Sequence, residues 1–392
     1  MKVKNRKKVG ILSVGRTDYS YFKPILQEII KSRSPEYFLI VAGMHLSSSF
    51  GSTYKEITGD GFHIDGKIAA THPSDSPEGV AKTISLMTSG MAAILKRNKL
   101  DALVILGDRF ETLGAAAAAI PYNIPIAHIC GGDVTEGLFD EQIRHAITKI
   151  AHIHFVTNKL SARRIIQMGE EKWRVFNVGS PSIDLMKQIK LYPRREFFKI
   201  HGLDVSRRLF LVTFHPVTLE SENTGSYLGN LIKALGHFDA NIIITYPNSD
   251  PTSRVIIRNF KEFAQKNKNV RFVKSLGPRG YFSALKYSDV MIGNSSSGII
   301  EAATFQLPIV DIGNRQKSRM AGKNVIHARY DAQDIIRKIE KSLTPRFKNS
   351  LKNLQNPYGK GGASKRIIMI LRRVLTKKTK KQIITKKFSL IK

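Results

Sequence analysis

The sequence has 392 residues, of which 42% are hydrophobic, and its formal net charge is +32. That length is sufficient for two globular domains, each with its own hydrophobic core. The single cysteine, Cys130, excludes a disulfide framework within the chain and is typical of a reducing compartment. No apolar run approaches the roughly 18 residues of a membrane span, and Val9–Val14 is too short for a signal peptide. We therefore expect a cytoplasmic protein.

Half of the net charge lies at the two ends of the sequence. Residues 1–8 contain five Lys or Arg, and residues 365–392 contain eleven and no acid. A basic tail of this kind can bind nucleic acid or anionic lipid. Because no motif of a nucleic-acid recognition module accompanies the tail, we favour a solvated tail over a nucleic-acid or membrane contact.

Short β-rich runs alternate with helical patterns along the chain. The predicted strands are Val9–Val14, Phe38–Gly43, Ala102–Leu106, Pro125–Ile129, His152–Thr157, Val175–Val178, Leu209–Phe214, Asn241–Tyr246, Val270–Val273, Val290–Ile292 and Pro308–Ile312. The predicted helices include Tyr19–Lys31, Glu78–Lys96, Glu111–Ile120, Asp140–Ile150, Tyr227–Leu235, Ser253–Lys266, Ile299–Phe305 and Lys365–Leu375. Nearly continuous apolar strands alternating with helices predict an α/β protein with two doubly wound parallel sheets.

Composition predicts the domain boundaries. We expect a Rossmann-like N-terminal domain in residues 1–186 and a second Rossmann-like domain in residues 208–355. The Lys- and Arg-rich stretch 187–207 is the predicted linker. Residues 356–376 should contain a C-terminal helix, and the basic tail 377–392 should be frayed.

Acidic side chains gather after two consecutive predicted strands. The stretch Ile105–His145 contains Asp108, Arg109, Glu111, Asp133, Glu136, Asp140, Glu141, Arg144 and His145. Residues just past the carboxyl ends of parallel strands converge on one crevice, where ligands bind. Several carboxylates there, on an otherwise basic chain, indicate acid–base chemistry rather than solubility.

Two loops are candidate anion sites. Gly293–Gly298, GNSSSG, lies between a predicted strand and a helix, so its N–H groups and hydroxyls could contact phosphates, and Glu301 could bind ribose hydroxyls. Gly15–Asp18, GRTD, follows the first strand, where Arg16 would favour an anion. A Ser-rich helix cap and a plain βα turn are the structural alternatives. Neither loop has a GxGxxG pattern or a Walker lysine, which disfavours NAD binding and ATP hydrolysis.

Histidines give weaker signals. His215 follows a predicted strand and could donate to a phosphate or act as an acid or base, although an isolated histidine is more often packed. The same reservation applies to His45, and His128 lies inside an apolar strand and is expected in the core.

Metal and hydrolase chemistry are disfavoured. Asp108, Asp133 and Asp140 could hold Mg²⁺, but no spacing typical of a dedicated metal site is present, and we predict no metal. No GxSxG elbow follows a strand, which argues against a Ser-His-Asp hydrolase.

Several motifs occur in a fixed order: RTDYSYFKPI, LGDRFE, GGDVTEGLFDEQIRHAITK, VGSPSID, FHPVT, YPNSD, GNSSSGIIEA and GNRQKSR. Together they resemble those of the hydrolysing UDP-N-acetylglucosamine 2-epimerases, over about residues 9–364. The resemblance implies a GT-B-like architecture, with two Rossmann-like domains, a UDP-sugar in the cleft between them and a C-terminal helix, in residues 356–376, that crosses back to the first domain. It also implies homo-oligomers, dimers or tetramers.

The resemblance further implies a reaction that needs no cofactor. UDP is eliminated across C1–C2 to give a 2-acetamidoglycal, and water then adds to release the free 2-epimer. The implied substrate is UDP-GlcNAc, giving ManNAc for sialic-type nonulosonic acids. UDP-2,4-diacetamido-2,4,6-trideoxyglucose, which leads to legionaminic acid, is the alternative substrate. A GT-B glycosyltransferase and a polyanion-binding protein are the competing hypotheses.

The resemblance also implies roles for individual residues. Asp108 and Asp140 match the catalytic carboxylates. The diphosphate is assigned to His215, which is also a catalytic candidate, and to Arg16, Ser295 and Ser296, and the ribose to Glu301. The remaining predicted substrate-binding residues are Asp18, His45, Arg109, Arg144, His145, Asn294 and Arg315.

One position departs from the family pattern. In sialic-acid-pathway members an acid commonly precedes the Gly-Gly, where this chain has Cys130. A thiol replaces a carboxylate base only with a strongly perturbed pKa. Glu136 and Asp133 are therefore rival candidates for the missing catalytic acid.

Overall fold

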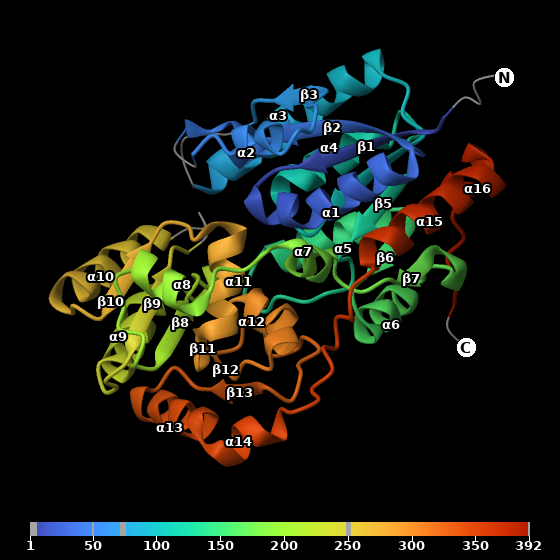
Figure 1. Ribbon diagram of the computed structural model, residues 1–392. Coiled ribbons are helices and arrows are strands. Elements are labelled where there is room, and N and C mark those ends of the chain that lie inside the picture. Colours follow the sequence, from blue (N-terminus) through green and yellow to red (C-terminus); the bar gives the residue numbers. More distant parts are fainter. Residues whose placement is uncertain (1–5, 49–50, 71–75, 248–251, 391–392) are drawn as a thin grey trace. The chain divides into compact units, whose positions relative to one another are not determined.

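The computed structural model describes residues 6–48, 51–70, 76–247 and 252–390. The last three residues of the YPNSD motif, 248–250, lie outside these ranges. The chain divides into two compact units, and each contains one wholly parallel sheet covered by helices (Figure 1). This arrangement confirms the predicted pair of α/β sheets. No helix in the described ranges is long and apolar enough to cross a membrane.

Unit 1 comprises residues 1–133, 140–185 and 361–392. Its strand order is β3-β2-β1-β4-β5-β6-β7. The strands are β1 (Lys8–Ser13), β2 (Glu36–Ala42), β3 (Gly66–Ile68), β4 (Ala102–Leu106), β5 (Ile126–Ile129), β6 (Ile153–Val156) and β7 (Val175–Asn177). The helices are α1 (Arg16–Ser32), α2 (Tyr54–Gly59), α3 (Pro77–Arg97), α4 (Phe110–Ala119), α5 (Asp140–Ile150), α6 (Lys159–Gln167), α15 (Ala363–Lys377) and α16 (Lys380–Ile384), with α7 (Pro181–Gln188) running into unit 2.

Unit 2 comprises residues 134–139 and 186–360. Its strand order is β10-β9-β8-β11-β12-β13. The strands are β8 (Leu209–Thr213), β9 (Asn241–Thr245), β10 (Val270–Val273), β11 (Val290–Gly293), β12 (Ile309–Ile312) and β13 (Val325–Ala328). The helices are α8 (Arg194–Ile200), α9 (Thr224–Leu235), α10 (Ser253–Lys266), α11 (Gly277–Tyr287), α12 (Ser296–Ile300), α13 (Ala332–Leu343) and α14 (Pro345–Ser350).

The strand order reverses once in each sheet, between β1 and β4 in unit 1 and between β8 and β11 in unit 2. At such a switch point the connections leave in opposite directions, and a crevice opens at the carboxyl ends of the strands. The central strands are apolar because helices cover both of their faces; β4 and β8, for example, are buried throughout. Each sheet therefore offers one preferred place for a ligand.

Every predicted strand is present, but two edge strands were missed. β3 and β13 have three and four residues and lie at the ends of their sheets. Runs this short have too few residues for a periodic pattern to stand out. The sequence prediction also omitted the helices α2, α6, α7, α8, α11, α13, α14 and α16.

The predicted linker 187–207 is folded into unit 2. It contains α8, whose Phe197 and Phe198 are buried. Phe197 packs against Tyr287 of α11 with ring centroids 5.9 Å apart. The Lys and Arg side chains of α8 face solvent, and its two phenylalanines pack into the core of unit 2.

The basic C-terminus is ordered rather than frayed. The apolar face of α15, with Ile367, Leu371 and Val374, is buried, and α15 packs against α1. After α15, Arg174 donates to the carbonyl oxygens of Ile383 at 2.7 Å and of Thr385 at 2.8 Å. The last turn and tail are therefore fixed to unit 1 by buried hydrogen bonds.

A buried carboxylate anchors the tail further. The Glu170 carboxylate pairs with Lys386 at 2.8 Å, Lys149 at 2.6 Å and His154 at 3.2 Å. Burial alone would raise the pKa of Glu170, but the hydrogen bonds from His154, Lys149 and Lys386 lower it to about 2. Lys386 also donates to the carbonyl oxygen of Ala151 at 2.7 Å. Lys386 thus joins the tail to the end of α5.

We expect Lys386→Met to lower the free energy of unfolding by about 1–3 kcal/mol, because it leaves buried acceptors without one donor. Trp173, the single tryptophan, lies next to Arg174 and reports on this region in urea unfolding followed by fluorescence. Lys365→Ala, at an exposed position of α15, is the control and should change stability by less than about 0.5 kcal/mol. Equal midpoints for Lys386→Met and the parent protein would contradict this account.

Candidate active site

In unit 1 the predicted site residues follow the strands on both sides of the switch point. Arg16 and Asp18 begin α1 after β1, and Asp108 and Arg109 follow β4. His45 follows β2 in a short 3-10 turn. The strand order, rather than any long-range sequence signal, brings these residues to one edge of the sheet.

Asp18 is a buried carboxyl with few compensating contacts. Its side chain is 5% exposed and accepts a hydrogen bond from the Val14 N–H at 3.0 Å. The pKa of Asp18 is raised to about 7, mainly by burial and also by the carboxylates of Glu111 and Asp108, against the lowering effects of the Val14 N–H and of Arg109. Asp18 therefore titrates near neutral pH.

His45 is fixed by two hydroxyl partners. Its Nε2 atom lies 2.8 Å from Ser13 Oγ, and its Nδ1 atom lies 2.7 Å from Thr53 Oγ1. Burial lowers the pKa of His45 to about 4, with a further contribution from Arg16. The neutral His45 ring, held by two hydrogen bonds, therefore fixes the loop after β2 and carries no positive charge.

A buried arginine connects three elements of unit 1. Arg144, on α5, forms an ion pair with Asp108 and donates to the Cys130 carbonyl oxygen at 3.3 Å. Its side chain is only 3% exposed, whereas Asp108 is 24% exposed. Cys130 follows β5 with a left-handed φ of 65°. The pair holds one Asp108 carboxylate oxygen and leaves the side chain partly open to solvent.

The acids after β5 have separate environments. Asp140 begins α5 and is 8% exposed. His145 lies one turn later and pairs with Glu141 at 3.0 Å. Asp133 is buried and accepts hydrogen bonds from Asn158, at 3.1 Å, and from Ser161. Because Asn158 also caps α6, Asp133 is built into the start of that helix.

Glu136 belongs to a loop held by unit 2. Ser318 donates to the Glu136 carboxylate. Arg319 donates to the Val134 carbonyl oxygen at 2.7 Å and to Thr135 Oγ1 at 2.9 Å. Ser318 and Arg319 were missed in the sequence prediction, although the GNRQKSR motif that contains them was noted.

In unit 2 the switch point brings two predicted loops together. The Asn294 amide accepts from the His215 N–H at 2.7 Å and donates to the His215 carbonyl oxygen at 2.9 Å. Gly293 precedes it with a φ of 134°, where a Cβ atom would lie 2.0 Å from the Thr213 carbonyl oxygen. Only glycine fits this contact, so the loops after β8 and β11 meet at a fixed distance.

The imidazole of His215 is neutral in this setting. His215 is 7% exposed, and burial, together with the Arg315 charge, lowers its pKa well below the usual 6.5. Arg315 donates to the Asn294 carbonyl oxygen at 3.0 Å, as does Gln316. Asn294 therefore organises the backbone of His215 and is itself held by the β12–β13 connection.

The helix after the serine-rich loop is shorter than predicted. α12 ends at Ile300, and a 3-10 turn, Ala302–Phe305, replaces the rest of the predicted helix Ile299–Phe305. Ser295 caps α12 by accepting from the Ser297 N–H at 3.4 Å. A helix of five residues aligns few peptide dipoles. An anion here would therefore be bound mainly by hydrogen bonds from local N–H and hydroxyl groups, with little contribution from a helix dipole.

Glu301 ends a short hydrogen-bonded chain. The Tyr281 hydroxyl donates to Ser297 Oγ at 2.6 Å, and Ser297 Oγ donates to the Glu301 carboxylate. Burial raises the pKa of Tyr281, so it remains a hydrogen-bond donor. Tyr281 was missed because a tyrosine inside an amphipathic helix gives no signal that separates packing from function.

Two further expectations concern core packing and metals. His128 is fully buried, its Nε2 atom lies 2.7 Å from the Gly107 carbonyl oxygen, and its predicted core position is confirmed. Among the described residues, no three His, Cys, Asp or Glu side chains form a group that could hold a metal ion.

We expect Asp18→Asn to change the pH dependence of stability. Folded Asp18 keeps its proton up to about pH 7 and unfolded Asp18 loses it near pH 4, so the parent protein loses stability as pH rises through this window. Asparagine does not ionise, and its oxygen can still accept from Val14. The unfolding free energy of the variant minus that of the parent should therefore increase from about pH 4 to about pH 8, by at most about 4 kcal/mol. Urea unfolding of both proteins at pH 4 and pH 8 measures this difference in free energy. A difference that does not change with pH would refute the expectation.

Comparison with known proteins identifies the family. The family model described as UDP-N-acetylglucosamine 2-epimerase matches residues 27–372. The chain is 35% identical to the GDP/UDP-N,N'-diacetylbacillosamine 2-epimerase (hydrolyzing) of Campylobacter jejuni, over 88% of this chain and 90% of that protein. It is 35% identical to the UDP-N,N'-diacetylbacillosamine 2-epimerase (hydrolyzing) of Legionella pneumophila, over 94% and 96%. It is 32% identical to a UDP-N-acetylglucosamine 2-epimerase of Neisseria meningitidis, over 86% and 88%.

The fold has close matches among solved structures. The crystal structure of UDP-GlcNAc 2-epimerase from Neisseria meningitidis bound to UDP-GlcNAc superimposes with a TM-score of 0.82 at 18% identity, covering 93% of this chain and all of that one. The two parallel sheets thus form the GT-B-like fold that the motifs predicted. The family match covers residues 27–372, which include strands of both sheets, and the chain belongs to the UDP-N-acetylglucosamine 2-epimerase family.

Proposed function

We propose that the chain is a hydrolysing 2-epimerase of a UDP-N-acetylhexosamine, and that UDP-GlcNAc is converted to ManNAc and UDP. The observation that carries the proposal is the Asp108–Arg144 pair at the carboxyl ends of β4 and β5, in a chain of this family. It supplies a partly exposed carboxylate whose orientation is fixed. The start of α5 supplies a second carboxylate, Asp140.

The proposed reaction has two proton transfers. In the first step a carboxylate removes the C2 proton, and the C1–O bond to UDP breaks, which gives a 2-acetamidoglycal. In the second step water adds its hydroxyl to C1, and C2 takes up a proton on the opposite face, which gives the free 2-epimer. We assign Asp108 and Asp140 to these transfers. The Arg144 guanidinium holds one oxygen of Asp108 and so fixes the orientation of its carboxylate.

The diphosphate is assigned to the switch point of unit 2. Ser295 and Ser296 offer N–H and hydroxyl donors at the start of α12. The role of Arg16, an exposed cation at the start of α1 in unit 1, is implied by the resemblance alone. His215 would act as a neutral hydrogen-bond donor, because its low pKa argues against an imidazolium. Glu301 would bind the ribose hydroxyls, with its orientation set by Ser297.

For the third acid we favour Glu136 over Asp133. Asp133 is enclosed by Asn158 and Ser161 at the start of α6 and is 3% exposed. Glu136 has one hydroxyl partner, Ser318, and is only partly buried. The partly exposed Glu136 carboxylate is therefore better placed than that of Asp133 to exchange a proton with a substrate.

Two substrates are compatible with the proposal. UDP-GlcNAc is the substrate named for the Neisseria relative at 32% identity, and the two relatives at 35% identity are named for N,N'-diacetylbacillosamine. UDP-N,N'-diacetylbacillosamine is therefore the second candidate. Side-by-side kcat/KM values with the two nucleotide sugars would distinguish them, because the sugars differ only at C4 and C6.

The reaction type is tested in D₂O. We expect purified protein to release UDP from at least one of the two nucleotide sugars and to introduce deuterium at C2 of the free 2-epimer, observed by NMR. A glycosyltransferase of the same fold would leave the C2–H bond intact, so UDP release without deuterium at C2 would refute epimerisation. Inactivity on both sugars would refute the proposal as a whole.

We expect Asp108→Asn and Asp140→Asn each to lower kcat by about 10² or more, because an amide can neither accept the C2 proton nor deliver one to C2. The Kd of UDP, measured by calorimetry, should change by less than about threefold in both variants, since the residues assigned to the diphosphate are unchanged. The control is Asp239→Asn, whose carboxylate is 79% exposed and pairs with Arg207 on the surface of unit 2. Near-normal turnover in either test variant would remove that residue from the catalytic set.

A further inference from the structure

The C-terminal segment presents cations from a rigid support. Residues 378–389 are held on unit 1 by Arg174, by the Glu170 ion pairs and by a hydrogen bond from the Ser389 N–H to the Gly169 carbonyl oxygen at 2.9 Å. The segment therefore cannot be treated as a loose chain of independent charges. Its side chains keep a fixed arrangement on the surface of unit 1.

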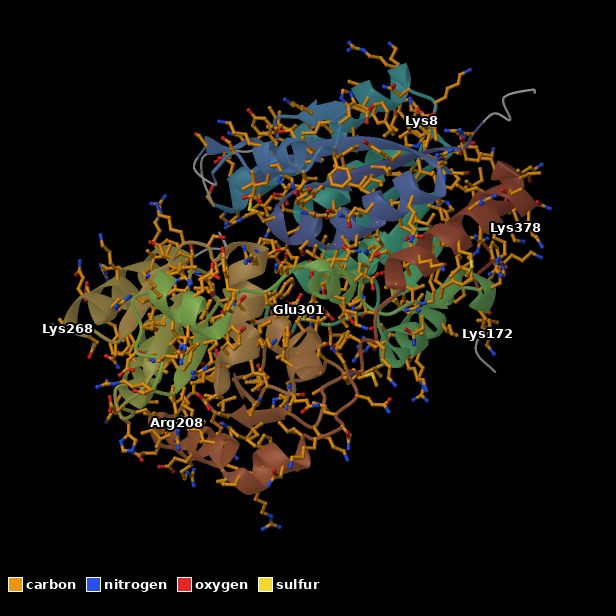
Figure 2. All side chains as sticks on the ribbon, viewed as in Figure 1. Lys8, Lys172, Arg208, Lys268, Glu301 and Lys378 are labelled. Carbon is orange, nitrogen blue, oxygen red and sulfur yellow. The ribbon has the colours of Figure 1, made fainter. Side chains whose placement is uncertain are left out.

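The positive charge there is not neutralised locally. The exposed cations of α15 and of the segment that follows it are Lys365, Arg372, Arg373, Lys377, Lys380, Lys381 and Lys387, and residues 365–392 contain no acid. The two neighbouring acids are already committed, Glu170 to Lys149, His154 and Lys386, and Glu171 to Arg174. Figure 2 shows Lys172 and Lys378 on the side of unit 1 that carries α15 and α16.

Apolar side chains stand among these cations. Phe388 is 70% exposed and Leu390 is 83% exposed. One side of the Phe388 ring rests on Gly169, where a Cβ atom would lie 2.6 Å from the ring, and Lys149 Nζ lies 5.0 Å from the ring centroid. Phe388 directly follows Lys387. Lys387, Lys381 and Lys378 line one shallow pocket of about 370 Å³ together with Trp173, Arg174 and Glu171, whose carboxylate is paired with Arg174.

We propose that Lys378, Lys381, Lys387, Phe388 and Leu390, here called the C-terminal basic surface, bind the protein peripherally to an anionic lipid surface. Lysines attract anionic headgroups at long range, and exposed Phe and Leu side chains enter the boundary between headgroups and acyl chains. Burial of apolar area and attraction to anionic lipids both strengthen interfacial binding, and this surface offers both.

The arrangement fits a membrane better than a nucleic acid. Single-stranded nucleic acids bind to grooves in which aromatic rings stack on bases. Trp173 is not open for stacking, because Arg174 and Lys378 each lie 4.2 Å from its ring centroid. Phe388 is covered on one side by Gly169, and Leu390 offers a base no stacking surface. Exposed apolar groups beside lysines are what a lipid interface requires.

The test is co-sedimentation of the full chain with vesicles. We expect binding to phosphatidylcholine vesicles that contain about 30% phosphatidylglycerol, little binding to pure phosphatidylcholine vesicles, and a steep decrease of binding with added salt. Phe388→Ser with Leu390→Ser should weaken binding to the anionic vesicles by about fivefold or more, although the net charge is unchanged. Lys381→Glu with Lys387→Glu should weaken it by about tenfold or more.

A matched control separates this surface from the overall charge. Lys266→Glu with Lys268→Glu changes the net charge by the same amount at exposed positions of unit 2 and should leave vesicle binding within about twofold of the parent protein. Equal loss in this control, or no effect of the Phe388 and Leu390 substitutions, would overturn the proposal. So would binding to single-stranded RNA, measured by fluorescence anisotropy, that is tighter than binding to the vesicles and unaffected by the Phe388 and Leu390 substitutions. Thermal unfolding by circular dichroism verifies that each variant is folded.

Discussion

The ion pair between Arg144 and Asp108 is the interaction on which the organisation of unit 1 depends. An arginine that is 3% exposed is costly unless its guanidinium is paired and hydrogen-bonded. The side chain meets this requirement with the Asp108 carboxylate after β4 and the Cys130 carbonyl oxygen after β5. The left-handed backbone at Cys130 belongs to the same constraint, because the bonded carbonyl is its own. One side chain on α5 thus fixes the ends of two strands and the helix on which Asp140 stands.

In unit 2 the loops at the switch point are held together by a neutral amide side chain rather than by an ion pair. Asn294 bonds both backbone groups of His215, and Arg315 and Gln316 bond the backbone of Asn294. A neutral side chain can bridge two loops without an ion's desolvation cost. Arg315 lies beside His215 and disfavours a second positive charge there, so the donor in this loop stays neutral. Both switch points are therefore rigid, one by an ion pair and the other by an amide.

The sequence predicted the architecture well, because parallel strands and amphipathic helices leave periodic patterns. β3 and β13 were not predicted, because runs of three or four residues at a sheet edge are too short to show a hydrophobic periodicity. α13 could have been found from Asp331, which caps it, and from the buried spacing of Ile335, Ile336 and Ile339. The length of α12 could not, because its last turn tightens to a 3-10 turn within the same apolar run.

The candidate site was predictable in residue type and less so in environment. Motifs and strand ends pointed to Asp108, Asp140 and His215, whereas the low pKa of His215 follows from its burial in the fold. The raised pKa of Asp18 and the lowered pKa of His45 depend on neighbours that only the fold brings together. For Asp133, the partners Asn158 and Ser161 are 25 and 28 residues away, and nothing in the local sequence marks them. Arg319 lies 185 residues from Val134, whose carbonyl it holds.

The return of the C-terminus to unit 1 bears on how the molecule is made. The α15 face that packs on α1, and the carbonyl acceptors of Arg174, are supplied by residues 363–385, which are synthesised after all segments of unit 2. Unit 2 has all of its segments once residue 360 has been synthesised, so it can fold during translation. Unit 1 contains the first strand but acquires its full core only after these residues have been synthesised. A stop codon just after residue 360 would therefore damage unit 1 and leave unit 2 with all of its segments.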